Sequence, residues 1–121
     1  MVERNAANQL SEILKAASDP TRRAILTHLA QHGPMRVTDI HEQFEMSLNS
    51  VSKHIKVLEK VGLVVRRTEW REHLIEVQMG PLSEIDQWFA ELRSIWELRL
   101  EALDELITDG VSKNERSKSN R

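Results

Sequence analysis

The feature that most restricts the fold of this chain is a long stripe of apolar residues in its C-terminal part. Between Leu82 and Ile107, apolar side chains recur every three or four positions, which is the period of one face of an α-helix. The chain has only 121 residues and can therefore build only one modest core. A stripe of this length exceeds what such a core can cover. We therefore expect a second surface to cover part of this helix.

Four shorter helices are predicted upstream of the stripe. Asp19 and Pro20 are typical of a helix start, because the carboxylate accepts an N–H of the first turn and proline lacks the N–H that would stay unpaired. Ser47 caps another helix, and Gly62 ends it. The residues that define the four helical faces are, in chain order, Leu10, Ile13, Leu14 and Ala17; Ala24, Ile25, His28 and Leu29; Val37, Ile40, His41 and Phe44; and Val51, Ile55 and Leu58.

Two short strands are predicted after the fourth helix. Residues 63–67 and 74–77 have the side chains typical of strands, and the link 68–73 joins them as a hairpin. This order of elements predicts a mainly α fold with a small β-hairpin, a winged helix-turn-helix whose first and last helices form a dimer interface. We expect one domain over residues 1–109, followed by a disordered polar and basic tail over residues 110–121.

Charge is unevenly distributed along the chain, although the net charge is only −2. Residues 47–73 hold six Lys or Arg against three acidic residues, whereas residues 81–109 hold two against eight. Phosphate contact needs a basic face rather than a basic protein. Both segments could also be ordinary solvated surfaces, so charge alone leaves DNA binding open.

Short polar side chains gather at the start of the fourth helix. A helix that reads base edges must expose small or polar groups at its N-terminal end. Asn49 has the amide that pairs with adenine, and Ser50 and Ser52 have hydroxyls that reach bases or phosphates. Lys53 and Lys56 are placed to contact the DNA backbone. The alternative is an ordinary capped surface helix rich in Ser and Asn.

Four motifs in a fixed order carry a resemblance to a known family. They are DPTRRAIL at 19–26, VTDI at 37–40, VSKHIKVL at 51–58 and GLV at 62–64. Over about residues 10–107 the chain resembles the ArsR family of winged-helix repressors, in the branch without the usual metal sites. The resemblance implies a homodimer that represses transcription by binding double-stranded DNA at a partly palindromic operator. The DNA contacts expected in the helices are Thr38, Asn49, Ser50, Ser52, Lys53, His54 and Lys56.

The hairpin would be the wing of such a fold. Arg66, Arg67 and Arg71 are placed to contact phosphates or a minor groove, although each could equally be a solubilising residue. Related sequences turn through a glycine before an Arg-Glu pair, whereas this chain has Trp70 before Arg71 and Glu72. Tryptophan rarely adopts a positive φ, so we predict a different turn. Trp70 is expected to pack back onto the body, with contact to DNA or a partner as the alternative.

The apolar stripe of the last helix is predicted to form the dimer interface together with the first helix. The residues expected there are Leu10, Ile13 and Leu14, with Phe89, Leu92, Trp96, Leu100 and Leu103. The alternative is that the last helix folds wholly onto its own subunit. An unknown small-molecule or protein inducer acting at the Trp-bearing part of this helix is a further hypothesis.

Several function classes are disfavoured by residues that the sequence lacks. There is no cysteine, and the last helix has no histidine, so we expect neither a metal nor another cofactor. The absence of a nucleophile elbow and of a phosphate-binding glycine loop predicts that the protein is not an enzyme. No signal peptide or membrane span is visible, and we expect a cytoplasmic protein. The remaining rival is a winged helix that binds another protein without reading DNA.

Overall fold

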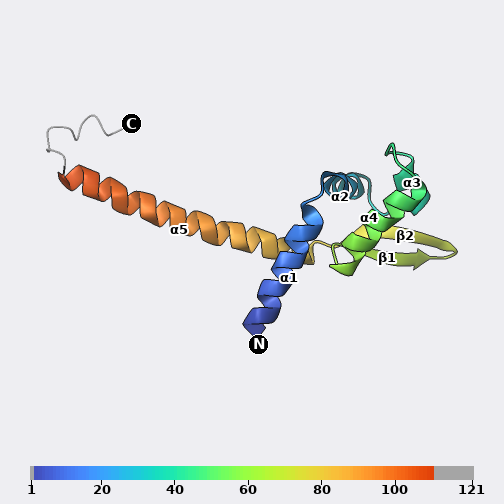
Figure 1. Cartoon of the computed structure of the whole chain (residues 1–121), viewed down its shortest axis with the longest axis horizontal. Helices are drawn as coiled ribbons and strands as arrows, with labels where there is room; N and C mark the ends of the chain where they lie inside the picture. The colour runs from blue at the N-terminus through green and yellow to red at the C-terminus, as the bar shows by residue number, and fades with distance from the viewer. Residues whose placement is uncertain (1, 111–121) are drawn as a thin grey trace. The chain divides into compact units, whose positions relative to one another are not determined.

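The computed structural model describes the backbone of residues 2–110 and the side chains of residues 8–108. The chain forms helices α1 (Val2–Ala17), α2 (Pro20–His32), α3 (Val37–His41), α4 (Leu48–Lys60) and α5 (Gly80–Gly110), and strands β1 (Val64–Glu69) and β2 (Glu72–Val77) (Figure 1). It divides into two units between Ile85 and Asp86, so α5 begins in the first unit and continues in the second.

The predicted fold class is confirmed, since the elements are five helices and one two-stranded antiparallel hairpin in the described chain. The expected single domain over residues 1–109 stays a prediction. Residues 111–121 of the expected disordered tail lie outside the described residues, whereas Gly110 is the last residue of α5.

The first unit is organised around one apolar core to which every one of its elements contributes. Fully buried side chains come from α1 to α4, from β1 with the residue before it, and from β2: Ile13, Ala16, Ile25, Leu29, Ile40, Val51, Ile55, Leu58, Leu63, Val64 and Ile75. Leu82 and Ile85 of the first turns of α5 pack against this core. The helical faces predicted from periodicity are therefore largely confirmed, although Ala24 is exposed on the outer side of α2.

The predicted helix starts are confirmed by their capping hydrogen bonds. Asp19 Oδ2 accepts the backbone N–H of Arg22 at 2.9 Å, and Ser47 Oγ accepts that of Ser50 at 3.1 Å. These bonds satisfy donors that have no partner within the helix. Gly62 follows Val61, the C-cap of α4, with a φ of +82°, the left-handed conformation in which glycine ends helices. The two caps thus define where α2 and α4 begin.

The hairpin differs from the prediction in the length of its link. The strands stay paired up to Glu69 opposite Glu72, so the turn has two residues and the expected link 68–73 was wrong. Thr68 and His73, which were assigned to that link, are partners across the strands, with Thr68 Oγ1 3.2 Å from His73 Nδ1. Backbone pairing therefore extends beyond the apolar residues that were used to predict the strands.

Candidate nucleic-acid interface

α4 is held in one rotational orientation by the residues that it buries. Val51, Ile55 and Leu58 lie on one face and have no exposed surface. Ser47 fixes the start of the helix, because its Oγ accepts the N–H of Ser50 and donates to the Ser50 hydroxyl at 3.0 Å. The opposite face and the first turn are therefore presented to solvent in a defined register.

The polar residues expected to contact DNA lie on or beside this presented face. Asn49, Lys53 and Lys56 are exposed, whereas the hydroxyls of Ser50 and Ser52 belong to half-buried residues. Thr38 is exposed on α3, the helix that packs against α4. The first turn of α4 thus carries an amide and a hydroxyl group, and its only large exposed apolar side chain is Leu48, which is 43% exposed. Ser52, Lys53 and Lys56 follow in the next two turns and add a hydroxyl and two ammonium groups.

Two of the hairpin arginines form ion pairs with carboxylates. Arg66 binds Glu59 of α4 through two hydrogen bonds of 3.2 Å. Arg67 lies 3.6 Å from Glu69 and 3.5 Å from Glu76. These pairs are solvent-exposed and therefore weak, but each places a negative charge beside the guanidinium that was expected to meet phosphate.

Arg36, which sequence reasoning did not single out, ties the hairpin to α3. Its guanidinium donates to both carboxylate oxygens of Asp39, at 3.0 and 3.1 Å, and its Nη1 lies 3.7 Å from Glu72. The hydrogen bond from Arg36 holds the pKa of Asp39 below its usual value of 3.8. Glu72 is the first residue of β2, so this contact places the tip of the hairpin beside the start of α3.

Trp70 contradicts both expectations made for it. Its φ is +62°, so it adopts the left-handed conformation that was considered unfavourable for tryptophan. Its side chain is 88% exposed and does not pack back onto the body. A two-residue hairpin turn needs a positive φ to match the twist of the strands, and the paired strands impose it here on Trp70.

The residues expected at a dimer interface fall into two groups. In the second unit, Phe89, Leu92, Trp96, Leu100 and Leu103 are each 44–57% exposed. In α1, Leu10 and Leu14 are half-buried. Ile13 is only 1% exposed because it faces the core of its own unit, so its assignment to the interface is corrected.

Comparison with known proteins agrees with this geometry. A helix-turn-helix domain model matches residues 17–67. The uncharacterized HTH-type transcriptional regulator MJ1325 of Methanocaldococcus jannaschii is 41% identical over 82 residues, which cover 68% of this chain and 92% of that regulator. The crystal structure of the ArsR family transcriptional regulator RHA00566 has a TM-score of 0.69 at 35% identity and covers 75% of this chain and 93% of that one. The chain belongs to the ArsR family.

A third relative shows this fold in a dimer. The solution structure of Mb0332 from Mycobacterium bovis, a homodimeric winged helix-turn-helix DNA-binding domain and possible ArsR-family regulator, has a TM-score of 0.59 at 26% identity. The match covers 83% of this chain and 89% of that one. Two other curated regulators, 41% and 40% identical, are matched over only 52% and 60% of their own length.

His54 of this ArsR-family chain is half-buried beside the start of α2. Its Nδ1 lies 3.4 Å from Nη1 of Arg22 and 3.8 Å from Oδ2 of Asp19. The ring therefore lies between α4 and the start of α2 with 24% of its side chain exposed, and its expected contact with DNA stays a prediction.

Arg22 is a second residue that sequence reasoning missed. Its Nε donates to the carbonyl of Ala16 at 2.6 Å, so it joins the end of α1 to the start of α2 and, through His54, to α4. Its backbone N–H is the main cause that lowers the pKa of Asp19 below 3.8. The sequence shows an arginine three residues after a helix cap, but it does not show its partners, which lie in α1 and α4.

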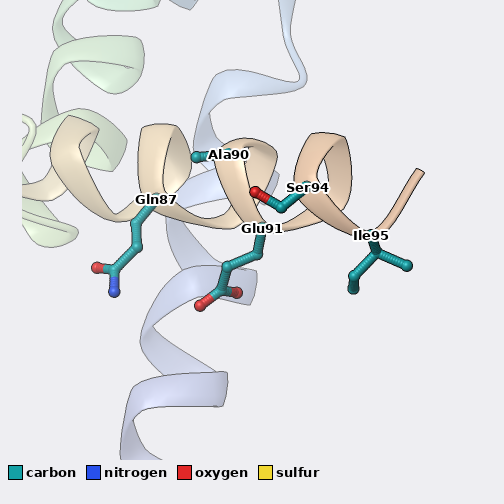
Figure 2. A pocket seen from close by; sticks show the side chains of 5 residues that line it. All are labelled: Gln87, Ala90, Glu91, Ser94 and Ile95. Atoms are coloured by element: carbon teal, nitrogen blue, oxygen red, sulfur yellow. The ribbon is translucent and has the colours of Figure 1, made fainter. Parts of the chain in front are cut away.

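One hollow of this ArsR-family chain lies along a single helix of the second unit. A hollow of about 460 Å³ runs along α5, lined by Gln87, Ala90, Glu91, Ser94 and Ile95 (Figure 2). All five belong to one helix, so the hollow lacks the enclosing walls of a small-molecule site.

Among residues 8–108, no three His, Asp or Glu side chains are grouped to hold a metal ion. Within the described helices, none combines the length and apolar character of a membrane span.

Proposed function

We propose that this ArsR-family protein is a homodimeric transcriptional repressor that binds a partly palindromic operator through the first turn of α4. The observation that carries the proposal is the contrast between the two faces of this helix. Val51, Ile55 and Leu58 are fully buried, while Asn49 and Lys53 are exposed at the end that would enter a major groove.

The chemistry of the N-terminal part of α4, residues 48–56, suits base and phosphate contact. An asparagine amide can donate to N7 and accept from N6 of adenine, which distinguishes adenine from the other bases in the major groove. Lys53 and Lys56 are exposed and take part in no ion pair among the described side chains, so their charges are available to phosphates. In this proposal Asn49 reads sequence, and the lysines fix the position of the helix on the backbone.

Dimerisation is proposed to place two such helices in successive major grooves. The exposed apolar side chains of α5, with Leu10 and Leu14 of α1, would supply the interface. The homodimeric state of the relative Mb0332 supports this arrangement. Two symmetry-related α4 helices would read half-sites about one helical turn, or roughly 34 Å, apart.

The protein is proposed to act by occupying DNA in the cytoplasm rather than by catalysis. The relatives named above are transcriptional regulators, which supports this class of activity. An inducer that releases the DNA is part of the hypothesis for α5.

The test is a charge reversal at Lys53 with a matched reversal at the other end of the same helix. The full-length chain selects a duplex from a random-sequence library, and affinity for that duplex is measured by fluorescence anisotropy at several salt concentrations. Lys53→Glu is expected to weaken binding about 100-fold, because it removes one phosphate contact and adds repulsion. Lys60→Glu, with the same change in net charge in the last turn of α4, is expected to bind within about threefold of the natural chain.

Two outcomes would contradict the proposal. If the natural chain binds the selected duplex no better than bulk DNA, the fold serves a purpose other than sequence-specific binding, such as contact with a protein. If Lys60→Glu weakens binding as much as Lys53→Glu, the N-terminal part of α4 has no special part in the contact.

A further inference from the structure

Three helices of the first unit meet at the side chain of Arg22, which lies in the first turn of α2. Its Nε donates to the carbonyl of Ala16 at 2.6 Å, and its Nη2 donates to the carbonyl of Lys15 at 3.4 Å. Both carbonyls belong to the last turn of α1, where a helix has no further N–H of its own to pair them. The third nitrogen, Nη1, lies 3.4 Å from Nδ1 of His54 on α4. One guanidinium of α2 thus contacts both α1 and α4.

The contact with Arg22 assigns a role to each nitrogen of the His54 ring. A guanidinium only donates hydrogen bonds, so in the neutral ring the facing Nδ1 is the acceptor and Nε2 carries the proton. The carboxylate of Asp19 lies 3.8 Å from Nδ1, which is too far for a hydrogen bond. Arg22 is therefore the group that fixes the tautomer of His54 and the direction of its Nδ1 edge.

His54 lies at the edge of the face by which α4 packs. It follows Val51 by three positions and precedes Leu58 by four, and both of these side chains are fully buried. Apolar packing is non-directional, whereas a hydrogen bond has a preferred angle. The contact at this edge therefore adds a directional restraint to the rotation of α4, and this rotation decides how Asn49 and Lys53 are presented to solvent.

We infer that Arg22 is a positioning residue for DNA binding, which is held by the last carbonyls of α1 and orients the N-terminal part of α4 through His54. The inference rests on the proposed function of α4 and adds to it a residue that acts through another side chain. Because α1 also contributes to the proposed dimer interface, the same guanidinium joins a helix of that interface to the helix that reads DNA. Direct contact of His54 with DNA is the competing assignment.

Arg23 offers a matched control for Arg22. Its Nη1 donates to the carbonyl of Ala17 at 2.8 Å, so it also binds the end of α1, but among the described side chains it forms no hydrogen bond or ion pair with α4. Both arginines are replaced by glutamine in the full-length chain, and affinity for the library-selected duplex is measured at a temperature at which circular dichroism shows the variants to be folded.

Arg22→Gln is expected to weaken binding about tenfold, because the orientation of α4 is no longer restrained, without changing the slope of log affinity against log salt. Arg23→Gln removes the same charge and is expected to bind within about twofold of the natural chain. Equal losses in the two variants, or a salt slope that falls in Arg22→Gln as it does when a phosphate contact is lost, would overturn the inference.

Two variants of His54 distinguish positioning from direct contact, and they do not depend on the folding of Arg22→Gln. The amide oxygen of asparagine can accept from the guanidinium in place of Nδ1, whereas leucine has no acceptor. His54→Leu is therefore expected to lose about tenfold in affinity, and His54→Asn is expected to stay within about threefold of the natural chain. A loss in His54→Asn as large as that in His54→Leu would show that the ring contacts DNA itself, and would overturn the inference.

The nitrogen chemical shifts of the His54 ring test the contact without DNA. At about pH 8, where the ring is neutral, the natural chain and Arg23→Gln are expected to show one tautomer with the proton on Nε2, and Arg22→Gln a mixture of both. A mixture in the natural chain would overturn the inference while leaving the proposed function intact. If the natural chain shows the single tautomer but selects no duplex, the proposed function fails, and the inference fails with it.

Discussion

α4 and α5 are both helices with an apolar face, but the two faces are used differently. In α4, Val51, Ile55 and Leu58 are completely buried in the core of their own unit. In α5, the apolar side chains of the stripe are 44–60% exposed: Phe89, Leu92, Trp96, Leu100, Leu103 and Ile107. A helix whose apolar face is buried in the core of its own unit can present its polar face to a ligand. A helix whose apolar face is uncovered within its own unit is suited to pair with another subunit.

The largest expected effect follows from charging the exposed face of α5. Leu100→Glu combined with Leu103→Glu would place carboxylates in the proposed dimer interface, where they could not be solvated. We expect the protein to become a monomer, with a mass near 14.0 kDa instead of twice that value by light scattering. Binding of the selected duplex should weaken about 1,000-fold or more, equivalent to about 4 kcal/mol, because only one half-site is then contacted at a time.

Ser94→Glu is the control for this change. Ser94 lies on α5 but does not belong to the stripe of Leu92, Trp96, Leu100 and Leu103. The variant should remain a dimer and bind DNA normally. A dimer that survives both leucine substitutions would show that α5 is not the interface.

An intermediate effect is expected from the same substitution made in each helix. Ile55→Ala removes a fully buried side chain and should lower the free energy of unfolding by about 3 kcal/mol, the usual cost of such a cavity. Ile95→Ala, at a position 64% exposed and outside the stripe, should change it by less than about 0.5 kcal/mol. Urea unfolding at one fixed protomer concentration measures both, since a dimer gains stability with concentration. Equal losses would refute the contrast between the two helices.

The smallest effect concerns the cap at Asp19, beside which His54 of α4 lies. The backbone N–H of Arg22 holds the pKa of Asp19 below 3.8, so the charged carboxylate stabilises the folded protein above about pH 3.8. This contribution is lost as the pH falls through the lowered pKa. Asp19→Asn keeps an oxygen for the cap but removes the charge.

The melting temperature of the natural chain should therefore exceed that of Asp19→Asn at pH 6. The difference should shrink when the pH is lowered below 3.8, as measured by circular dichroism. A difference in melting temperature that is constant between pH 6 and pH 3 would mean that the charge of Asp19 does not stabilise the start of α2.

The parts of the fold that could be predicted from sequence depend on interactions between near neighbours. The caps at Asp19 and Ser47 each join residues three positions apart, and the sequence places both partners. The buried faces of α2 and α4 follow from helical periodicity, and most of their residues were predicted correctly. The exposed polar turn at Asn49 could be located because the same periodicity that buries Val51 turns Asn49 outward.

The errors concern contacts between elements. Trp70 was expected to avoid a positive φ, but strand pairing outweighs this local preference. The roles of Arg22 and Arg36 depend on partners in other elements, which spacing along the chain does not reveal. Ile13 lies on the same helix as Leu10 and Leu14, and only the packing of α1 decides which of them faces the core.

The most direct test of the account asks whether α4 reads bases through Asn49. The random-sequence selection is repeated with Asn49→Ala, and the preferred duplexes are compared with those of the natural chain. We expect one base pair in each half-site, an adenine in the natural motif, to lose its preference, while the spacing between half-sites stays the same. An unchanged motif at full preference in every position would contradict the claim that the first turn of this helix enters the major groove.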